Sequence, residues 1–497
     1  MLGAVSVFGI SGMRQSLPTA ITRLEGTAHT RKSSETRMVK SRIMRTSALA
    51  LCLALLAPAV PSVSAQTFSV PVVYKKLPNG LRVVISENHA APVVVVELMY
   101  RIGFRIEPKG RTGFAHLFEH LMFQGSEHVA KFEHVRIVNE NGGTLNGSTR
   151  FDHTNYFEVM PSNALELAMW LEADRMKSLK ITPETLKNQQ DVVSEEVRVN
   201  VLNQPYGAFE WLGLPQKANT NWYNAHNLYG DLAELEAANL DDVKTFYDTY
   251  YAPNNAVLVV SGDTTADEVM RLAEKHFGSI PQRALPPRPD IKEPPQTAEK
   301  SFTETDKLAR TPAVAFGYHL PERMTKDFFA LSLLDPLLVS DESAKMYQAL
   351  IKENQIASDV SGGFNYALGN NFDYNGPMLY TFRVDYRPGL KGTDVIKVVD
   401  KVIRAIQEHG ISANELRQAK VNFRSSFLES IEGGSIPGFG RSDLLAALAL
   451  YDDDPNRINT ILRELDKVTL ADVQQAAKKY LVPTNRTSID RRPEAAR

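Results

Sequence analysis

The pattern of apolar and polar positions first indicates strands. A turn at Leu77–Gly80 precedes an apolar strand at Leu81–Ser86. Val93–Tyr100 is mainly β-branched and apolar, as expected of a strand at the centre of a sheet. Two further runs, Thr154–Met160 and Ala256–Ser261, have the same character. The part of the chain before residue 262 is therefore expected to contain a sheet.

Helical segments are predicted between these strands. One helix is expected over Ala164–Leu179, with Ser162 as its N-cap, and another from Pro183 to about Asn200. Thr182 is a favourable N-cap for the second helix, and proline is favoured at the first helical position. Strands mixed with helices of this length predict an α+β fold.

The chain contains a weak internal repeat. Leu240-Asp241-Asp242-Val243 recurs as Leu470-Ala471-Asp472-Val473, and Ile181-Thr182 recurs at the same offset as Ile411-Ser412. One offset shared by separate segments favours duplication of an α+β domain over chance similarity. The period, about 230 residues, is far too long for a solenoid.

Length and composition agree with a duplicated globular protein. The 497 residues favour more than one domain, and 43% hydrophobic and 23% charged residues are ordinary for a folded chain. The net charge of −2 gives no support for nucleic-acid binding. A Pro-rich segment predicts a semi-rigid linker. The expected organisation is a leader over residues 1–65, an N-terminal domain over 66–280, the linker over 281–298, a C-terminal domain over 299–490 and a tail over 491–497.

The leader has the pattern of a secretory signal peptide over about residues 38–65. Basic residues precede the apolar run Ala48–Val60, and small residues occupy the cleavage positions at Val63-Ser64-Ala65. The run is too short to cross a bilayer, so the mature chain is expected to have no membrane span. Cleavage near Ala65 would also remove Cys52, the one cysteine. We expect a periplasmic or secreted bacterial protein whose metal ligands are His and carboxylate.

His116-Leu117-Phe118-Glu119-His120 is a candidate metal-binding motif. It reads H-x-x-E-H, the inverse of the commoner zinc-protease motif. Residues at i and i+4 share one helix face, so the two histidines can bind one metal, and Glu119 is close enough to act on a metal-bound water. Glu195 and Glu196 on the second predicted helix offer a third ligand. Their positions alone do not separate them, because adjacent helix residues point about 100° apart.

With these motifs the chain resembles the pitrilysin, insulysin and mitochondrial processing peptidase family of zinc peptidases, in its short bacterial form. The resemblance covers about residues 68–490 and also rests on Gly142-Gly143-x-x-Asn146-x-x-Thr149 and Thr154-x-Tyr156. It implies two homologous α/β-sandwich domains that form a half-shell, each with an antiparallel-rich sheet packed by helices. It also implies one zinc ion per chain and an endopeptidase that cuts peptides or unfolded polypeptide segments.

The resemblance assigns roles to the residues of the metal motif. His116, His120 and Glu196 would be the zinc ligands, which selects Glu196 over Glu195. Glu119 would be the general base that takes a proton from the water and passes it to the leaving amine.

The same resemblance implies residues that contact substrate or support the ligands. Asn146 and Gly147 would bind a peptide as an added strand, while a simple turn after the glycines is the alternative for Asn146. Gln189 stands where the family often has a glutamate, and it can hydrogen-bond but cannot carry charge. Nearby histidines are expected to be surface or supporting residues rather than ligands: His128, His134 and His153.

The second half of the chain lacks residues that the active single-chain members carry. Those members have an arginine and, seven residues later, a tyrosine, where this chain has Ile351 and Ser358. At the offset of the repeat, the metal motif corresponds to Met346, Ala349 and Leu350, so the second half is expected to be metal-free. We expect a heterodimer with a homologous zinc-less subunit that carries the Arg/Tyr pair, or otherwise a homodimer. A non-catalytic binding or assembly protein on the same fold is the alternative function.

Overall fold

The computed structural model describes residues 68–433 and 436–494. The predicted leader and signal peptide, with Cys52 and the cleavage site near Ala65, lie outside the described residues, as does the end of the predicted tail. Among the helices in the described ranges, none is long and apolar enough to span a bilayer.

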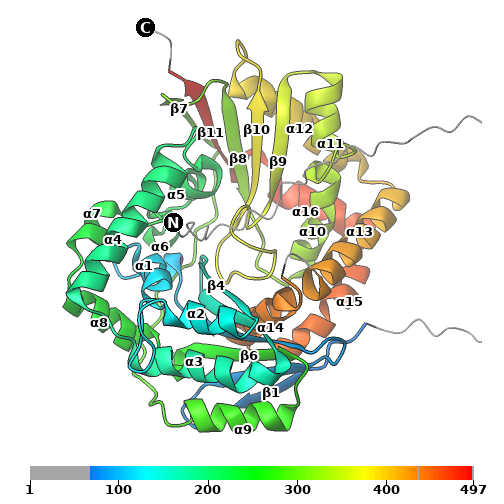
Figure 1. Cartoon of the computed structure of the whole chain (residues 1–497). Helices are drawn as coiled ribbons and strands as arrows, with labels where there is room; N and C mark the ends of the chain where they lie inside the picture. The colour runs from blue at the N-terminus through cyan, green and yellow to red at the C-terminus, as the bar shows by residue number, and fades with distance from the viewer. Residues whose placement is uncertain (1–67, 434–435, 495–497) are drawn as a thin grey trace, which may run out of the picture. The chain divides into compact units, whose positions relative to one another are not determined.

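The described strands form two sheets (Figure 1). The first sheet has the strand order β1-β2-β6-β3-β5-β4 and the second has β7-β11-β8-β10-β9. We call residues 68–299, with the first sheet, the first half, and residues 300–494, with the second sheet, the second half. The strands are β1 (Val73–Lys76), β2 (Arg82–Glu87), β3 (Val93–Tyr100), β4 (Thr144–Thr149), β5 (Thr154–Pro161), β6 (Ala256–Gly262), β7 (Lys300–Asp306), β8 (Ala313–His319), β9 (Ala357–Phe364), β10 (Leu379–Tyr386) and β11 (Arg486–Pro493).

Helices make up most of the remaining described structure. They are α1 (Phe114–Leu121), α2 (Glu133–Glu140), α3 (Leu165–Ser178), α4 (Pro183–Val197), α5 (Leu214–Ala218), α6 (Trp222–Ala225), α7 (Leu232–Ala237), α8 (Leu240–Tyr250), α9 (Ala266–Phe277), α10 (Lys326–Val339), α11 (Lys345–Tyr347), α12 (Gly392–His409), α13 (Ala413–Glu432), α14 (Phe439–Asp452), α15 (Ile461–Asp466) and α16 (Leu470–Tyr480). The 3₁₀ and π turns used below are η1 (Phe104–Ile106), η3 (Arg198–Leu202), η4 (Phe209–Gly213) and η6 (Gln348–Glu353).

Most of the elements predicted from the sequence are present. Strand β3 has the predicted bounds, and the side chain of Thr182 caps α4 by accepting the backbone N–H of Thr185. The N-cap predicted at Ser162 is wrong, because a 3₁₀ turn over Ser162–Ala164 precedes α3 and the Ser162 hydroxyl donates to Asp263 instead. Helix α4 ends at Val197 and continues as the π turn η3.

The two sheets have the same topology, which confirms the predicted duplication of an antiparallel-rich α+β domain. In each sheet the last strand pairs in parallel with the first shared strand, β6 with β2 and β11 with β7. The remaining strands follow in the same order with antiparallel pairing, and β1 is an addition to the first sheet.

The constant offset found in the sequence applies to only part of the repeat. It relates α4 to α13, α8 to α16 and β6 to β11, but β3 and β8, which begin at Val93 and Ala313, are closer together along the chain. Because α1 follows β3 as α10 follows β8, the counterpart of the H-x-x-E-H helix is α10. The equivalence with Met346, Ala349 and Leu350 is therefore wrong, since these residues lie on α11 and η6, before β9. Helix α10 itself has no histidine or glutamate.

One face of the first sheet is covered by a helix from the second half. Val96 and Leu98 of β3 belong to the core under α1 and α3, and the intervening Glu97 points to the opposite face because successive strand residues alternate. Helix α14 packs on that opposite face (Figure 1). There the hydroxyl oxygens of Ser261 on β6 and Ser442 on α14 lie 2.6 Å apart.

The second sheet is covered in the reciprocal way by a segment of the first half. Phe209 of η4 and Leu214 of α5 share a core with Ala315 of β8 and Ile489 of β11. Leu214 corresponds to Leu444 of α14 at the offset of the repeat. The same helix of each copy is therefore exchanged onto the sheet of the other copy.

A carboxyl cluster is buried under α14. The Asn155 amide donates to Glu97 Oε1 at 2.9 Å and to Asp443 Oδ1 at 3.2 Å. Burial raises the pKa of Glu97 well above its usual range and that of Asp443 to about 6. Carboxyl groups therefore join the first sheet to the exchanged helix.

Candidate metal centre

The helix that carries the H-x-x-E-H motif starts at a fixed point in the fold. Gly113 precedes α1 with a φ of 85°, which glycine adopts readily. The Glu107 carboxyl accepts hydrogen bonds from the backbone N–H groups of Gly113 at 2.8 Å and Ala115 at 2.6 Å. These bonds satisfy N–H groups that a helix start leaves without partners. Burial raises the pKa of Glu107 to about 8.

Three side chains converge where α1 packs against α4. His116 Nε2 lies 3.6 Å from Glu196 Oε1, and His120 Nε2 lies 3.3 Å from Glu196 Oε2. The ring centroids of His116 and His120 are 5.0 Å apart. One ligand atom from each residue falls within 4.8 Å of the others. The structure therefore brings together the residues for which the sequence analysis predicted zinc binding.

The structure places the two adjacent glutamates of α4 differently. Glu195 faces solvent and lies 3.7 Å from Arg198. Glu196 is turned inward to the two histidines. Helical rotation between adjacent residues accounts for the difference, so only Glu196 is near enough to share a metal with α1.

The electrostatics of the cluster favour a charged Glu196. Burial favours its neutral form, but hydrogen bonds and charge from His116 and His120 outweigh burial and hold the pKa of Glu196 well below its usual range. Burial alone would lower the pKa of His116, whereas the hydrogen bond to Glu196 and the charge of Glu119 raise it overall. The histidine–carboxylate contacts account for both directions.

Glu119 lies on α1 between the two histidines, and only one of its two carboxylate oxygens accepts a hydrogen bond in the described part of the chain. Thr149, at the end of β4, donates its hydroxyl to Glu119 Oε2 at 2.6 Å. Glu119 Oε1 is buried and has no hydrogen-bond partner among the described residues. A buried carboxylate oxygen without a partner is costly, and such atoms are typical of sites that bind a ligand or transfer a proton.

The donor set fits a zinc ion. Two imidazoles and one carboxylate are the ligands of many catalytic zinc sites, in which a fourth position stays open. His120 Nε2 is buried and faces Glu196 Oε2, so a metal between the two side chains would be bound by both. His116, His120 and Glu196 could therefore hold the ion.

A second group of possible ligands is already neutralised by an arginine. His134, Glu158 and Glu172 lie close enough to share a metal, but the guanidinium of Arg175 forms ion pairs with both glutamates. Burial, aided by Arg175, lowers the pKa of His134 to about 3. The positive charge that these carboxylates need is thus supplied by Arg175 of the protein itself. The cluster is better explained as a buried ion-pair network than as a metal site.

The other nearby histidines have protein partners. His128 Nδ1 lies 2.6 Å from Asp174, and His153 Nδ1 lies 2.6 Å from the Tyr451 hydroxyl. Neither belongs to the groups of possible metal ligands found in the described part of the chain.

The residues predicted to bind substrate lie on β4, at the edge of the first sheet. Asn146 is opposite Phe157 of β5, and its side-chain oxygen accepts the N–H of Gly147 at 2.9 Å. Gly147 is opposite Tyr156, whose ring would meet an added Cβ at 3.1 Å. Asn146 is thus a strand residue rather than part of a simple turn.

The remaining predicted residues make their described hydrogen bonds to groups other than the candidate metal ligands. Gln189 is buried on α4, and its amide donates to Asn188. None of the hydrogen bonds described for this part of the chain joins Gln189 to His116. Ile351 lies on η6 of the second half and Ser358 on β9, where the Ser358 hydroxyl donates to the backbone of Asp385.

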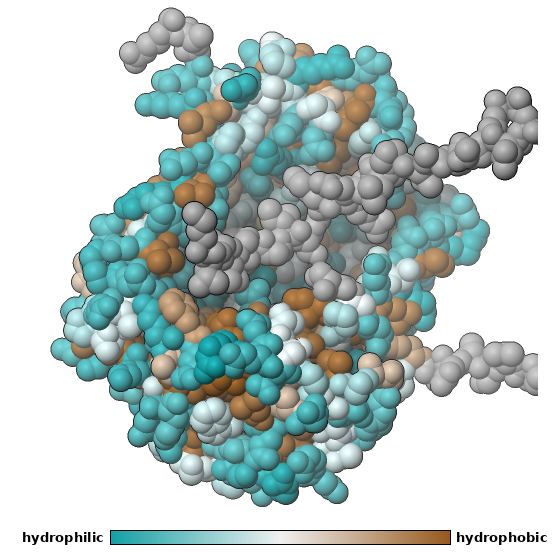
Figure 2. Space-filling model, in the orientation of Figure 1, coloured by the Kyte–Doolittle hydropathy of each residue, from teal (hydrophilic) through white to brown (hydrophobic). Residues whose placement is uncertain are grey.

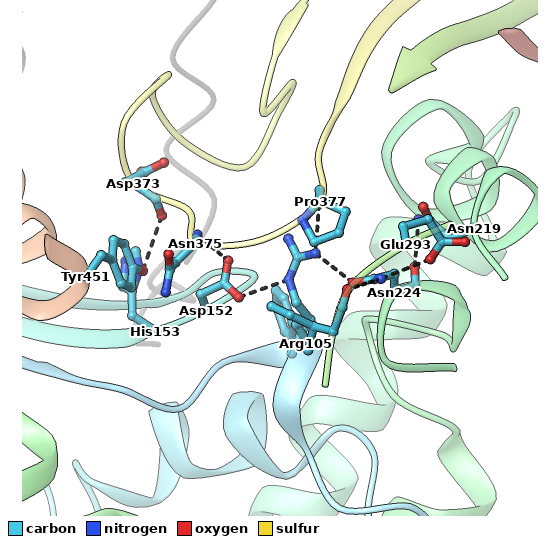
Figure 3. Close-up of polar contacts among 12 residues, drawn as sticks. Arg105, Asp152, His153, Asn219, Asn224, Glu293, Asp373, Asn375, Pro377 and Tyr451 are labelled. Carbon is cyan, nitrogen blue, oxygen red and sulfur yellow. Dashed lines mark hydrogen bonds and ion pairs between the residues drawn. The ribbon is translucent and has the colours of Figure 1, made fainter. Parts of the chain in front are cut away.

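A polar network links the second half to the segment that leads into α1 (Figure 3). Arg105 of η1 is buried and donates to the carbonyl of Pro377 at 2.7 Å and to Asn224 at 2.8 Å. It also pairs with Asp152 at 2.9 Å, and Asp152 accepts the N–H of Asn375 at 2.7 Å. Arg105 is two residues before the helix-capping Glu107, so the second half helps to fix the position of α1.

Sequence reasoning missed Glu107, Arg105 and Tyr229, although all three support the centre. Glu107 lies six residues before the N-cap Gly113, outside the spacing of a capping box, and Arg105 makes its bonds with distant segments, so no local signal marks either residue. No local pattern marks Tyr229, which lies 33 residues after Glu196 and donates its hydroxyl to that carboxylate.

Known proteins resemble this chain along most of its length. The model of the family described as Insulinase (Peptidase family M16) matches residues 82–213, and that of the Peptidase M16 inactive domain matches residues 237–423. The zinc protease PqqE of Helicobacter pylori is 27% identical over 430 residues, which cover 84% of this chain and 92% of that protein. An uncharacterized zinc protease of Mycobacterium leprae is 26% identical over 410 residues, covering 82% and 88% of the two chains.

Solved structures share the fold. The crystal structure of a protease from Helicobacter pylori superimposes with a TM-score of 0.79 at 26% identity, covering 86% of this chain and all of that one (100%). The two family models match successive parts of this chain, in the order of its two sheets, and the relatives are named as zinc proteases. The chain belongs to peptidase family M16, the insulinase family.

Proposed function

We propose that this chain is an exported zinc metallo-endopeptidase that hydrolyses peptides or unfolded polypeptide segments. The observation that carries the proposal is the convergence of His116, His120 and Glu196 beside a buried Glu119 oxygen that has no hydrogen-bond partner in the described structure. The family membership and the names of the relatives support peptidase chemistry.

The roles follow from the positions of the side chains. His116, His120 and Glu196 would hold one zinc ion, which as a Lewis acid lowers the pKa of water and polarises a peptide carbonyl. Glu119 would act as general base: Thr149 holds Oε2, so Oε1 is left to take the proton from the attacking water. The same oxygen would then deliver the proton to the leaving amine.

Edge strand β4 is suited to hold the substrate. It is the last strand of its sheet and packs beside α1, so an extended peptide could add to it through backbone hydrogen bonds near the metal centre. On the face shown in Figure 2, hydrophobic residues are scattered among hydrophilic ones, and some lie just below the middle of the view, where Figure 1 places β4 and α14. Such a surface would accommodate apolar side chains of a bound peptide, and Asn146 and Gly147 would contact its backbone.

A partner subunit is the second part of the proposal. Ile351 has no side-chain donor, and the short Ser358 hydroxyl already donates to the backbone of Asp385, so neither residue replaces the long donors arginine and tyrosine. A homologous zinc-less chain with that pair would complete the site, and a homodimer is the next arrangement to consider.

The test measures peptide hydrolysis by the mature protein, from Gln66, alone and mixed with a co-encoded homologue. Activity should disappear with a chelator and return with zinc. Glu119→Gln should retain zinc and lose about 10²- to 10⁴-fold in turnover. Zinc binding with no hydrolysis in either preparation would favour the alternative, a binding or assembly protein. Hydrolysis by the chain alone would exclude an obligate partner.

A further inference from the structure

Tyr229 contacts the candidate metal ligands on both helices. Its hydroxyl donates to Glu196 Oε1 at 3.0 Å, and its ring lies 5.0 Å from the ring of His116. The side chain is only 2% exposed. We infer that Tyr229 is a positioning residue, which orients the Glu196 carboxylate toward the metal position. The inference rests on the ligand set of the proposed function.

The two oxygens of Glu196 have different surroundings. Oε1 accepts from Tyr229 and lies 3.6 Å from His116 Nε2, whereas Oε2 faces His120 Nε2 at 3.3 Å. The terminal torsion of a glutamate has only a broad preference, so a free carboxylate would rotate among many orientations. A donor fixed on Oε1 restricts that rotation and keeps Oε2 turned toward His120. Hydrogen bonds to ligating carboxylates have this effect in metal sites generally.

Tyr229 is itself held by the segment that starts α1. The next residue, Gly230, packs so closely on Gly113 that an added Cβ would lie 2.4 Å from the Gly113 Cα. Asp231 donates its N–H to the Thr112 hydroxyl at 3.0 Å, and Thr112 donates its own N–H to Glu234 at 2.8 Å. The tyrosine is therefore fixed to the start of the helix that carries His116.

The alternative is that Tyr229 is a core aromatic whose hydroxyl takes the nearest acceptor. Its ring packs on Trp211 and Phe104, with centroids 5.8 and 6.3 Å away. A purely structural role predicts that loss of the hydroxyl lowers stability without changing metal affinity.

Tyr386 of the second half provides a matched control. It is 1% exposed and its hydroxyl donates to the buried Asp490 carboxylate, with no histidine in the pair. Tyr386→Phe and Tyr229→Phe therefore each remove one tyrosine–carboxylate hydrogen bond and keep the ring.

The experiment measures zinc affinity of the mature chain by competition with a chromophoric chelator, and thermal unfolding of the metal-free protein. Tyr229→Phe should bind zinc about 10- to 100-fold more weakly. Tyr386→Phe should bind zinc like the wild type, even if its unfolding temperature falls. Wild-type zinc affinity in Tyr229→Phe, or an equal loss in both variants, would overturn the inference.

Glu196→Gln separates this inference from the proposed function. It should lose far more affinity than Tyr229→Phe, and adding Tyr229→Phe to it should cost little more, because the tyrosine acts through Glu196. Wild-type affinity in Glu196→Gln would show that the proposed ligand set is wrong. A large loss in Glu196→Gln with none in Tyr229→Phe would overturn the positioning role alone.

Discussion

The two halves of this chain share a sheet topology but differ at the helices that matter for chemistry. In the first half, α1 presents His116 and His120 to Glu196 of α4, and Glu119 to Thr149 of β4. In the second half the equivalent helix, α10, is mainly apolar and contains Pro336. Glu196 of α4 is matched by Ser426 of α13 at the offset that relates these two helices.

Few structural features distinguish the first half, which has the candidate metal centre, from the second half, which lacks it. Strand order, the exchanged helix and the capped helix starts occur in both copies. The difference lies in a few side chains on two helices. A shared fold therefore says little about chemistry, which depends on the residues at one site.

Loss of one histidine should produce the largest contrast between the halves. His120→Ala should reduce zinc binding and peptide hydrolysis by about 10³-fold or more, because only two ligands remain. Ser332→Ala, on the equivalent helix α10, should leave both unchanged. Inductively coupled plasma mass spectrometry and a peptide cleavage assay would measure the two effects. Full zinc occupancy in His120→Ala would contradict the assignment.

A smaller loss of activity is expected when Glu119, the proposed general base, keeps its charge but loses the hydrogen bond from Thr149. Thr149→Val should lower kcat about 10- to 100-fold with little change in KM, the value of one hydrogen bond to a charged group. Thr149→Ser should restore most of the rate, and Thr144→Val, on the same strand, should behave like the wild type. Equal kcat values in Thr149→Val and wild type would remove this role from Thr149.

The contact between halves under α14 should depend on pH. The native state binds the Asp443 proton more tightly than the unfolded chain does, since burial raises its pKa from 3.8 to about 6. The stabilisation from this group is complete below pH 3.8 and is lost as the pH rises through about 6. Asp443→Asn should lack this component. Urea unfolding between pH 4 and 7 would reveal it, and identical pH slopes in the two proteins would refute it.

The smallest effect is expected on the exposed faces of the matched helices. Lys187 and Asp191 form an i, i+4 pair on α4, and the equivalent positions on α13 hold Arg417 and Val421. Exchanging the residues by Asp191→Val or Val421→Asp should change the free energy of unfolding by less than about 0.5 kcal/mol. A change above about 1 kcal/mol in chemical unfolding would mean that these surfaces have partners.

Much of the fold could be predicted because its signals are local. Val93–Tyr100 and Pro183–Val197 show their periodicity and cap within a few residues, and the structure has both elements. The H-x-x-E-H motif needs only the helical period to place His116 and His120 on one face. The roles of these residues and of Glu196 remain predictions that the cluster geometry supports.

The features that the sequence analysis did not predict depend on contacts between segments that are distant along the chain. Glu107 and Tyr229 reach the centre from turns, where no period marks an inward-facing side chain. The counterpart of α1 was predicted at the wrong position because the offset is not constant. The segments between the first strands of each half differ in length. In the sequence, the exchange of η4–α5 and α14 is marked only by scattered identities at the common offset, such as Phe209 with Phe439 and Leu214 with Leu444.

The exchanged helices also determine when the protein can complete its fold during synthesis. Once the ribosome has made β6, all six strands of the first sheet exist, but the face that includes Val95, Met99 and Val257 stays bare until α14 emerges. A nascent chain thus leaves this face of the sheet uncovered from the completion of β6 at Gly262 until α14 has been made, and a holding chaperone would protect it. For the same reason, a fragment cut after the first half would retain the proposed zinc ligands and expose this face, and we expect it to aggregate.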